Sequence, residues 1–199
     1  LMVYSFPSQI FWCTKPITSI ADFKNTKVRT FNVSSADLLR HFGATTLNFP
    51  FAEFASSLER GVADCGITGS LPVYQTKVWQ VAKHVYTLKL GWGVAFLAAN
   101  KNTWDSLNDD TKALMKAELA KLEDQLWELN KNSDQIGIDC NTDGPCDLGE
   151  PGGMTLHEPS EEDLATLRQA VQDSVLKNWA ARCSEECIAT WNDTIGKLT

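Results

Sequence analysis

Hydrophobic and polar positions in residues 27–100 alternate between short apolar runs and helical patterns. Strands that alternate with helices of about ten residues are typical of βαβ units and a mostly parallel sheet. The expected strands are 27–31, 45–49, 62–68, 84–90 and 94–98. The expected helices run from a cap at Ser34 or Ser35 to Phe42, from 50 to 61, and from 72 to 82, with Gly69 and Ser70 as a turn before the last.

A long helical pattern follows, from an N-cap at Asn108 to a stop at Gly137. Such a helix of about 28 residues is roughly 40 Å long, more than one small lobe needs, so two adjoining lobes are expected to share it. Its apolar positions recur at spacings of three and four and predict a face packed in the core: Met115, Leu119, Leu122, Leu126 and Leu129.

The two ends of the chain complete the pattern. Residues 1–6 have the pattern of a strand, with no loop or cap before it. The chain is therefore expected to begin in the middle of a larger protein. Residues 138–158 are rich in Gly, Pro, Asp and Cys and predict an irregular loop, with a short strand at 154–156. Helices are expected at 159–179 and 185–195.

Composition excludes some classes of function. The 199 residues are 43% hydrophobic and 22% charged, as in ordinary globular proteins, and the net charge is −7. An acidic chain argues against nucleic-acid binding, because phosphate contacts need clustered Lys and Arg. The chain has no apolar run of 18 residues that would span a membrane, and no signal peptide is visible at its start.

Cysteines occur at positions 13, 65, 140, 146, 183 and 187. Close pairs favour disulfides and an oxidising compartment such as the periplasm, with Cys140, Cys146, Cys183 and Cys187 as candidates. Local pairs are the simplest arrangement, although two cysteines four apart on one helix are poorly placed for a bond, and cross-pairs stay open. A zinc site of four thiolates is a weaker alternative, because the spacings differ from the usual ones. The other two cysteines are a possible redox pair without a Cys-x-x-Cys motif.

Candidate binding residues lie at the carboxyl ends of the predicted strands or directly after them, because ligands of open α/β sheets bind outside the carboxyl ends of the strands. Arg29 offers a planar fork of donors that matches a carboxylate. The side chains after these strands add neutral hydrogen bonds, from Asn32, Thr68 and Ser70, and apolar walls, from Phe31 and Phe51. Together with nearby helix N-termini they favour a small organic acid.

Two alternatives stand beside this interpretation. Arg29 could instead form a structural ion pair with Asp64 or Glu53. An enzyme of carboxylate metabolism would need a nucleophile and a base, and the chain has no Gly-x-Ser-x-Gly, His-Glu-x-x-His or glycine-rich phosphate motif. We therefore expect no enzyme activity, no cofactor and no metal site; a disulfide-stapled interaction fragment without ligand remains the third hypothesis.

Three segments carry a resemblance to a known family: 16–29, which leads into Arg29, then 43–54 with Phe49-Pro50-Phe51, and 58–64 with Leu58-Glu59-Arg60-Gly61. In order and spacing they resemble solute receptors of TRAP transporters, the DctP family. The resemblance covers nearly the whole chain. It implies a periplasmic-binding-protein-like, two-lobed α/β fold that closes on its ligand by hinge motion and delivers it to a TRAP membrane permease.

The resemblance also implies roles for single residues. Arg29 matches the arginine that grips the ligand carboxylate, Phe51 a ring against the ligand, and Thr68 a polar contact. Phe31 and Asn32 match two further pocket positions. Gln9 falls where many members have a second arginine, which implies a clamp of one arginine. Aromatic residues that include Trp92 and Trp12 favour an apolar or aromatic monocarboxylate.

Family members have a considerable stretch before the position of Leu1, and it builds much of the first lobe. The resemblance thus divides the chain into an arginine-bearing lobe at 1–90, joined by part of 138–170, a strand and spanning helix at 91–137, and C-terminal helices at 171–199. A chain without the missing stretch is expected to expose apolar surface and either to self-associate or to require the missing part.

Overall fold

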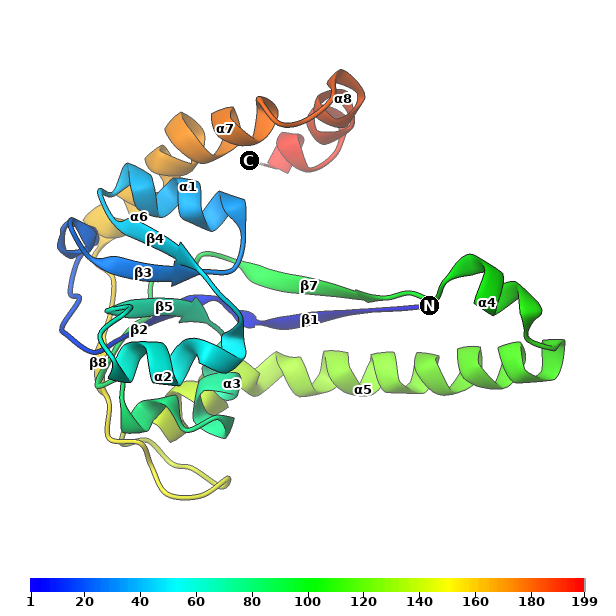
Figure 1. Cartoon of the computed structure of the whole chain (residues 1–199), viewed down its shortest axis with the longest axis horizontal. Helices are drawn as coiled ribbons and strands as arrows, with labels where there is room; N and C mark the ends of the chain where they lie inside the picture. The colour runs from blue at the N-terminus through cyan, green and yellow to red at the C-terminus, as the bar shows by residue number, and fades with distance from the viewer. Residues whose placement is uncertain (199) are drawn as a thin grey trace.

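The computed structural model describes residues 1–198 and shows an α/β body from which a long arm projects (Figure 1). The body contains a six-stranded sheet in the order β4-β3-β5-β2-β6-β8. Its strands are β2 Ile10–Cys13, β3 Lys27–Thr30, β4 Thr45–Asn48, β5 Cys65–Thr68, β6 His84–Tyr86 and β8 Thr155–His157. Strand β2 is antiparallel to both neighbours, whereas the other three pairings are parallel. The sheet is therefore mixed, and β2 is a strand that the sequence pattern did not predict.

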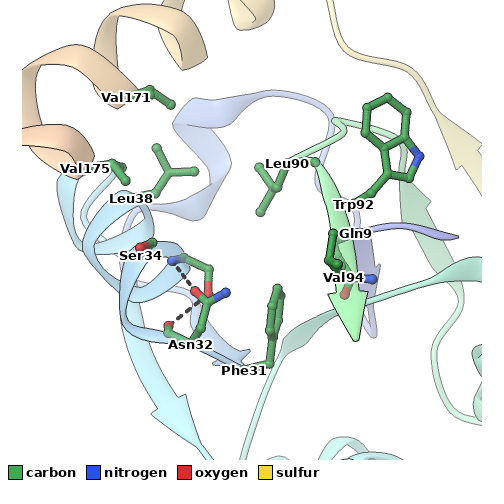
Figure 2. A pocket seen from close by; sticks show the side chains of 13 residues that line it. Gln9, Phe31, Asn32, Ser34, Leu38, Leu90, Trp92, Val94, Val171 and Val175 are labelled. Atoms are coloured by element: carbon green, nitrogen blue, oxygen red, sulfur yellow. Dashed lines mark hydrogen bonds between the residues drawn. The ribbon is translucent and has the colours of Figure 1, made fainter. Parts of the chain in front are cut away.

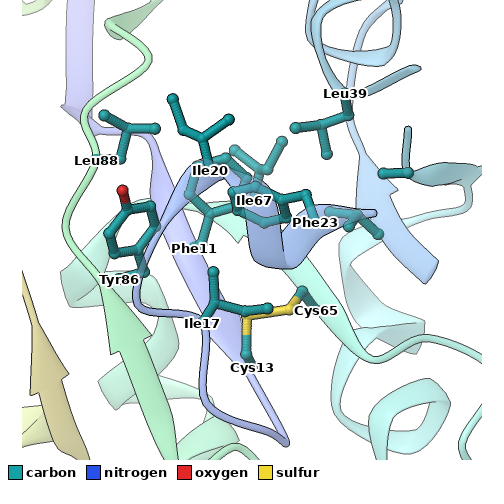
Figure 3. Close-up of a cluster of buried hydrophobic side chains, with 12 residues drawn as sticks. Phe11, Cys13, Ile17, Ile20, Phe23, Leu39, Cys65, Ile67, Tyr86 and Leu88 are labelled. Carbon is teal, nitrogen blue, oxygen red and sulfur yellow. A yellow bond between two sulfur atoms is a disulfide. The ribbon is translucent and has the colours of Figure 1, made fainter. Parts of the chain in front are cut away.

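Helices cover both faces of the sheet. Every residue of β2 is therefore buried, and its side chains alternate between two cores. Phe11 and Cys13 join one core, which Figure 3 shows with Phe23 and Leu39. The helices over this face are η1 Ile20–Phe23, α1 Val33–His41 and α6 Glu161–Ala170. The helices over the other face are α2 Phe54–Glu59 and α3 Ser70–Gln75.

Disulfides connect all six cysteines in three pairs. Cys13 and Cys65 are directly opposite each other on β2 and β5 and are fully buried, so their bond joins two strands inside the core. The pairs Cys140–Cys146 and Cys183–Cys187 are the local ones expected. The two cysteines of the second pair do not lie on one helix. Cys183 precedes Ser184, the N-cap of α8 Glu185–Asp193, and only Cys187 is helical.

The arm consists of a two-stranded ribbon and one long helix that runs beside it (Figure 1). Strand β1 Met2–Ser8 pairs antiparallel with β7 Trp92–Leu97. The long helix is α5 Asp109–Asn141, with 33 residues and the expected N-cap at Asn108, and the short α4 Lys101–Ser106 precedes it. The Trp127 indole N–H donates to Val3 O at 2.9 Å, and the Asn130 amide donates to Ser5 O, so α5 is fastened to β1. No helix in residues 1–198 combines the length and apolar character needed to cross a membrane.

The apolar stripe of α5 is not buried in a core, and the packing predicted for it is wrong. Met115, Leu122 and Leu129 are all exposed, and the ribbon beside the helix exposes Phe96 to 74%. A periodic apolar pattern reports which face of a helix is hydrophobic, but not whether another element covers it. The arm therefore presents a large apolar surface, whose main exposed residues are Phe6, Trp92, Val94, Phe96, Leu97, Leu114, Met115, Leu122, Trp127 and Leu129.

Gly137 lies inside α5 rather than at its end, so the helix is longer than the sequence predicted. Glycine is required there by the close approach of α3. A Cβ atom at position 137 would lie 2.4 Å from Leu71 N and 2.4 Å from Ser70 Oγ. The same residue type serves helix ends and close contacts, which is why the sequence pattern was misread.

Several element boundaries also differ from the expected ones. The cap of α1 is Asn32, whose side chain accepts a hydrogen bond from Ser35 N at 2.8 Å, rather than Ser34 or Ser35. Ser70 begins α3, and the expected helix through residue 82 is split into α3 and a 3-10 turn, η3 Val78–Gln80. Another 3-10 turn, η2 Phe51–Glu53, precedes α2. After α6 the chain continues through a π-helical turn, η4 Val171–Val175, α7 Leu176–Ala180, α8 and η5 Ile195–Leu198.

Asp163 joins α6 to η1 and is expected to matter for stability. Its buried carboxylate accepts hydrogen bonds from Ile20 N at 2.8 Å, Ser160 N at 3.0 Å and Ser160 Oγ at 2.7 Å. Burial alone would raise the pKa of Asp163, but these hydrogen bonds outweigh burial and lower it. We expect Asp163→Ala to reduce the free energy of unfolding by about 2–3 kcal/mol, since it breaks the capping box that Asp163 forms with Ser160 and leaves the buried N–H of Ile20 without its acceptor.

The sign of the pH effect follows from the lowered pKa. The stabilisation by Asp163 is complete above its unfolded-state pKa of about 3.9 and is lost as the pH falls through the lower folded-state value. Urea unfolding at neutral pH measures the predicted loss, with the exposed neighbour Glu162→Ala as control. Equal stability of the two variants would contradict the role of Asp163.

A second pH effect comes from a pair of histidines at one edge of the sheet. His84 Nδ1 lies 3.1 Å from His157 Nε2, and burial together with the charge of His157 lowers the pKa of His84. The unfolded chain, with a His pKa of about 6.5, therefore binds more protons than the folded protein. We expect unfolding free energy to fall as the pH decreases below about 6.5. Urea unfolding across this range should show a flatter dependence for His84→Gln and an unchanged one for the exposed control His41→Gln; an unchanged slope in His84→Gln would refute the effect.

Candidate functional site

The candidate site lies at the edge of the sheet where the carboxyl ends of β3, β4 and β5 meet. These strands are parallel, so the residues that follow them converge. Strand β2 is antiparallel to β5, which brings its preceding residue, Gln9, to the same edge. A cavity of about 400 Å³ opens there, and its lining residues are Phe6, Gln9, Arg29, Phe31, Phe51, Thr68, Gly69, Pro72, Gly93 and Val94. Five predicted site residues therefore share one pocket: Gln9, Arg29, Phe31, Phe51 and Thr68.

Arg29 is the only charged side chain that lines this pocket, and it is 7% exposed. Its Nε donates to Phe49 O at 3.2 Å, and its Nη1 donates to Ile67 O at 3.0 Å. These bonds fix the plane of the guanidinium. A guanidinium has five N–H donors, so about three remain for a ligand.

No carboxylate within residues 1–198 forms an ion pair with Arg29. Asp64, one proposed partner, accepts from Lys27 N at 2.8 Å and lies 3.8 Å from Lys15 Nζ. Burial lowers the pKa of Arg29, but a guanidinium stays charged in proteins. A buried cation without an anion is costly, and a ligand carboxylate would offset that cost.

The walls of the pocket are mostly apolar. The Phe51 ring centroid lies 6.0 Å from the Arg29 guanidinium carbon, at the outer range of a cation–π contact. The hydroxyl of Thr68 forms no hydrogen bond with another described residue, and the Gln9 amide donates to Pro7 O at 2.9 Å. The pocket therefore offers one cation, a few neutral polar groups and aromatic sides.

Two predicted residues, Asn32 and Trp92, line a neighbouring pocket of about 430 Å³ (Figure 2). The oxygen of Asn32 caps α1, so only its amide N–H₂ is free for a ligand. Trp92 lies at the rim of this pocket and is 70% exposed. Both residues are close to the site but not beside Arg29.

Ser70 does not line either of these pockets, which corrects its expected place as a ligand contact. Its hydroxyl is buried against α5, where it donates to Asp134 O at 3.0 Å and lies 3.2 Å from Ser133 O. Trp12 is also fully buried, and its indole N–H donates to Thr68 O at 3.0 Å. Both side chains support the pocket from behind.

The ribbon contributes pocket residues that the sequence interpretation missed: Phe6, Gly93 and Val94. The chain crosses from the ribbon to the sheet at Gln9, whose N–H donates to Gly91 O at 2.9 Å and whose carbonyl accepts from Leu90 N at 3.0 Å. Asp134 of α5 holds the same crossing, since it accepts from Ser8 N at 2.6 Å. The Gly91-Trp92-Gly93 interruption between two strand-like runs was the available signal.

The sequence of residues 8–182 matches the family DctP, bacterial extracellular solute-binding protein, family 7, and the chain belongs to this family. It is a family of transport proteins, not of enzymes. A curated relative is the ectoine-binding periplasmic protein TeaA of Halomonas elongata, 26% identical over 117 residues. That match covers 58% of this chain and 34% of TeaA.

Solved structures show the same fold. A TRAP periplasmic solute-binding protein of Desulfovibrio salexigens with bound orotic acid superposes with a TM-score of 0.85 at 17% identity, covering 99% of this chain and 62% of that one. DctP7 of Bordetella pertussis, which binds pyroglutamic acid, gives a TM-score of 0.81 at 18% identity, covering 93% and 58%. The predicted α/β fold of TRAP solute-binding proteins is thus confirmed, and this chain spans less than two thirds of the relatives it matches.

Proposed function

We propose that this chain is the arginine-bearing part of an extracytoplasmic receptor that binds a small organic acid by its carboxylate. The observation that carries the proposal is Arg29, a buried guanidinium with free donors and no carboxylate partner in the described chain. The receptor would deliver its ligand to TRAP-type permease subunits from the periplasm, where the disulfides would persist. It would bind the ligand and release it unchanged.

The geometry supports binding in three parts. The bonds from Arg29 to Phe49 O and Ile67 O orient the guanidinium before a ligand arrives, which reduces the entropy lost on binding. A charge-assisted bidentate pair would then hold the carboxylate. Phe51 and Phe31 would pack against the remainder, and Thr68 and Gln9 would add hydrogen bonds. With glutamine rather than a second cation at position 9, a monocarboxylate is favoured.

Other members of the fold support an acid as ligand. Besides the orotic-acid and pyroglutamic-acid receptors, a Sulfitobacter protein has bound β-D-galacturonate and a Rhodoferax ferrireducens protein has bound malonate. Calorimetric titration with a panel of acids and their primary amides tests the proposal. Acids should bind and the amides should not, and mass spectrometry should recover the acid unchanged. Equal affinity for an acid and its amide would contradict it.

The domain division also stays a proposal, with one adjustment: β1 pairs with β7, so residues 2–8 belong with the ribbon rather than with the arginine-bearing lobe. The ribbon and α5 would then form the connection to the other lobe. Hinge motion would occur at the crossing near Gln9, where Asp134 holds Ser8.

The exposed apolar arm predicts self-association of the 199-residue chain. Phe96 is 74% exposed and Leu114 63%, and β7 has a free edge on the side away from β1. Analytical ultracentrifugation should show dimers or larger species at micromolar concentration. Phe96→Lys should shift the distribution towards monomer, while Lys83→Ala on the body should not. A strictly monomeric wild-type chain would contradict this prediction.

A further inference from the structure

A second pocket adjoins the Arg29 pocket and differs from it in chemistry. The two cavities, of about 400 and 430 Å³, share the side chains of Gln9 and Phe31 as a common wall. Figure 2 shows the second one as a space between α1 and the start of the ribbon, with Phe31 beside it. No lining residue of the second pocket is charged.

The second pocket is a hydrophobic groove with walls from three separate elements. Leu38 of α1, Val171 and Val175 face Leu90 across the opening (Figure 2). The two valines come from the π-helical turn η4, which packs on α1. Turns of this kind inside α-helices are frequent at functional sites. Leu90 is only partly covered by the core below it, so its outer side is free to contact a ligand.

We infer that this groove is a subsite for the apolar tail of the ligand whose carboxylate Arg29 holds, an inference that rests on the proposed function. Arg29 is the single charge along the combined lining, so a ligand that fills both pockets carries one carboxylate and an otherwise neutral, apolar body. The tail passes Phe31 and ends between Leu90 and Val171. The preferred substrate class is therefore a monocarboxylate with a medium-length alkyl or an aryl tail, rather than a short dicarboxylate.

The test is calorimetric titration of the purified protein with straight-chain acids from butanoate to octanoate. Each methylene that enters the groove should tighten binding about fourfold. Val171→Glu places a charge in the groove and should abolish this gain with chain length, while butanoate affinity stays within about twofold of the wild type. Gln172→Glu adds the same charge at the exposed neighbouring position and should behave like the wild type. Circular dichroism checks that both variants are folded.

The possible results distinguish failure of the subsite from failure of the proposed function. Butanoate binding without a gain for octanoate overturns the subsite and leaves the role of Arg29 intact. A length-dependent gain that persists in Val171→Glu also overturns it, because the tail then lies elsewhere. Octanoate binding that is equally tight in Arg29→Ala shows apolar adsorption unrelated to the clamp. If none of the acids binds, the proposed function fails, and the subsite with it.

Discussion

Replacing Arg29 with methionine should weaken acid binding strongly without lowering the melting temperature of the ligand-free protein. The substitution removes the charge-assisted pair with the ligand, which should weaken binding on the order of 10- to 150-fold, the equivalent of about 1.5–3 kcal/mol. Stability should be retained because the protein loses a buried cation that has no anion. Calorimetry and thermal unfolding measure the two effects on the same samples.

Two further variants sharpen this prediction. Arg29→Lys keeps the charge but loses the planar fork, so its affinity should fall between those of the wild type and Arg29→Met. Arg60→Ala removes an exposed arginine at the end of α2 and serves as the matched control, with unchanged affinity. A structural ion pair would give the opposite pattern, namely a marked loss of stability in Arg29→Met and unaltered ligand affinity.

Gly137→Ala should destabilise the protein by about 3 kcal/mol, the upper range for overpacking. The added methyl would lie 2.4 Å from Leu71 N and 2.6 Å from Ser70 C, and neither backbone atom can rotate away. Helix α5 would have to move from α3 and weaken the hydrogen bond from Ser70 to Asp134 O. Because α3 also presents Pro72 to the Arg29 pocket, acid binding should weaken as well.

Whether Gly137→Ala stabilises or destabilises the protein tests the close approach of α3 and α5. In an exposed helix, glycine to alanine stabilises by roughly 1 kcal/mol, so stabilisation by Gly137→Ala would show that α3 and α5 do not approach closely. Asn132→Ala, on the exposed side of the same helix, should have only a small effect. Urea unfolding of the two variants, analysed for the midpoint and the slope, distinguishes these results.

The position of the Arg29 pocket was predictable because one local rule determines it. Arg29 and Thr68 lie at the carboxyl ends of β3 and β5, and Phe31 and Phe51 follow β3 and β4; these strands are parallel neighbours, so their ends meet. Gln9 could be assigned only through the resemblance to the DctP family. Strand β2 is buried on both faces, and its short run of apolar residues does not reveal a strand or its direction.

The features that were missed depend on contacts far apart in the sequence. Ser70 begins a helix beside the site, but it bonds to α5 more than 60 residues later, and no local pattern encodes that choice. Gly137 was read as a helix end for the same reason. Likewise, the stripe from Met115 to Leu129 is apolar and periodic, yet Met115, Leu122 and Leu129 are exposed because no described element covers them. Sequence periodicity thus predicts elements and their faces, whereas the partners of each face require the fold.

A crystal structure of the protein with the tightest-binding acid of the panel tests the central claim most directly. We expect the ligand carboxylate to accept hydrogen bonds from Arg29 Nη1 and Nη2 at about 2.7–2.9 Å, with Phe51 against the ligand. The guanidinium should keep its bonds to Phe49 O and Ile67 O. An acid bound elsewhere, with the Arg29 donors left unengaged, would contradict the account.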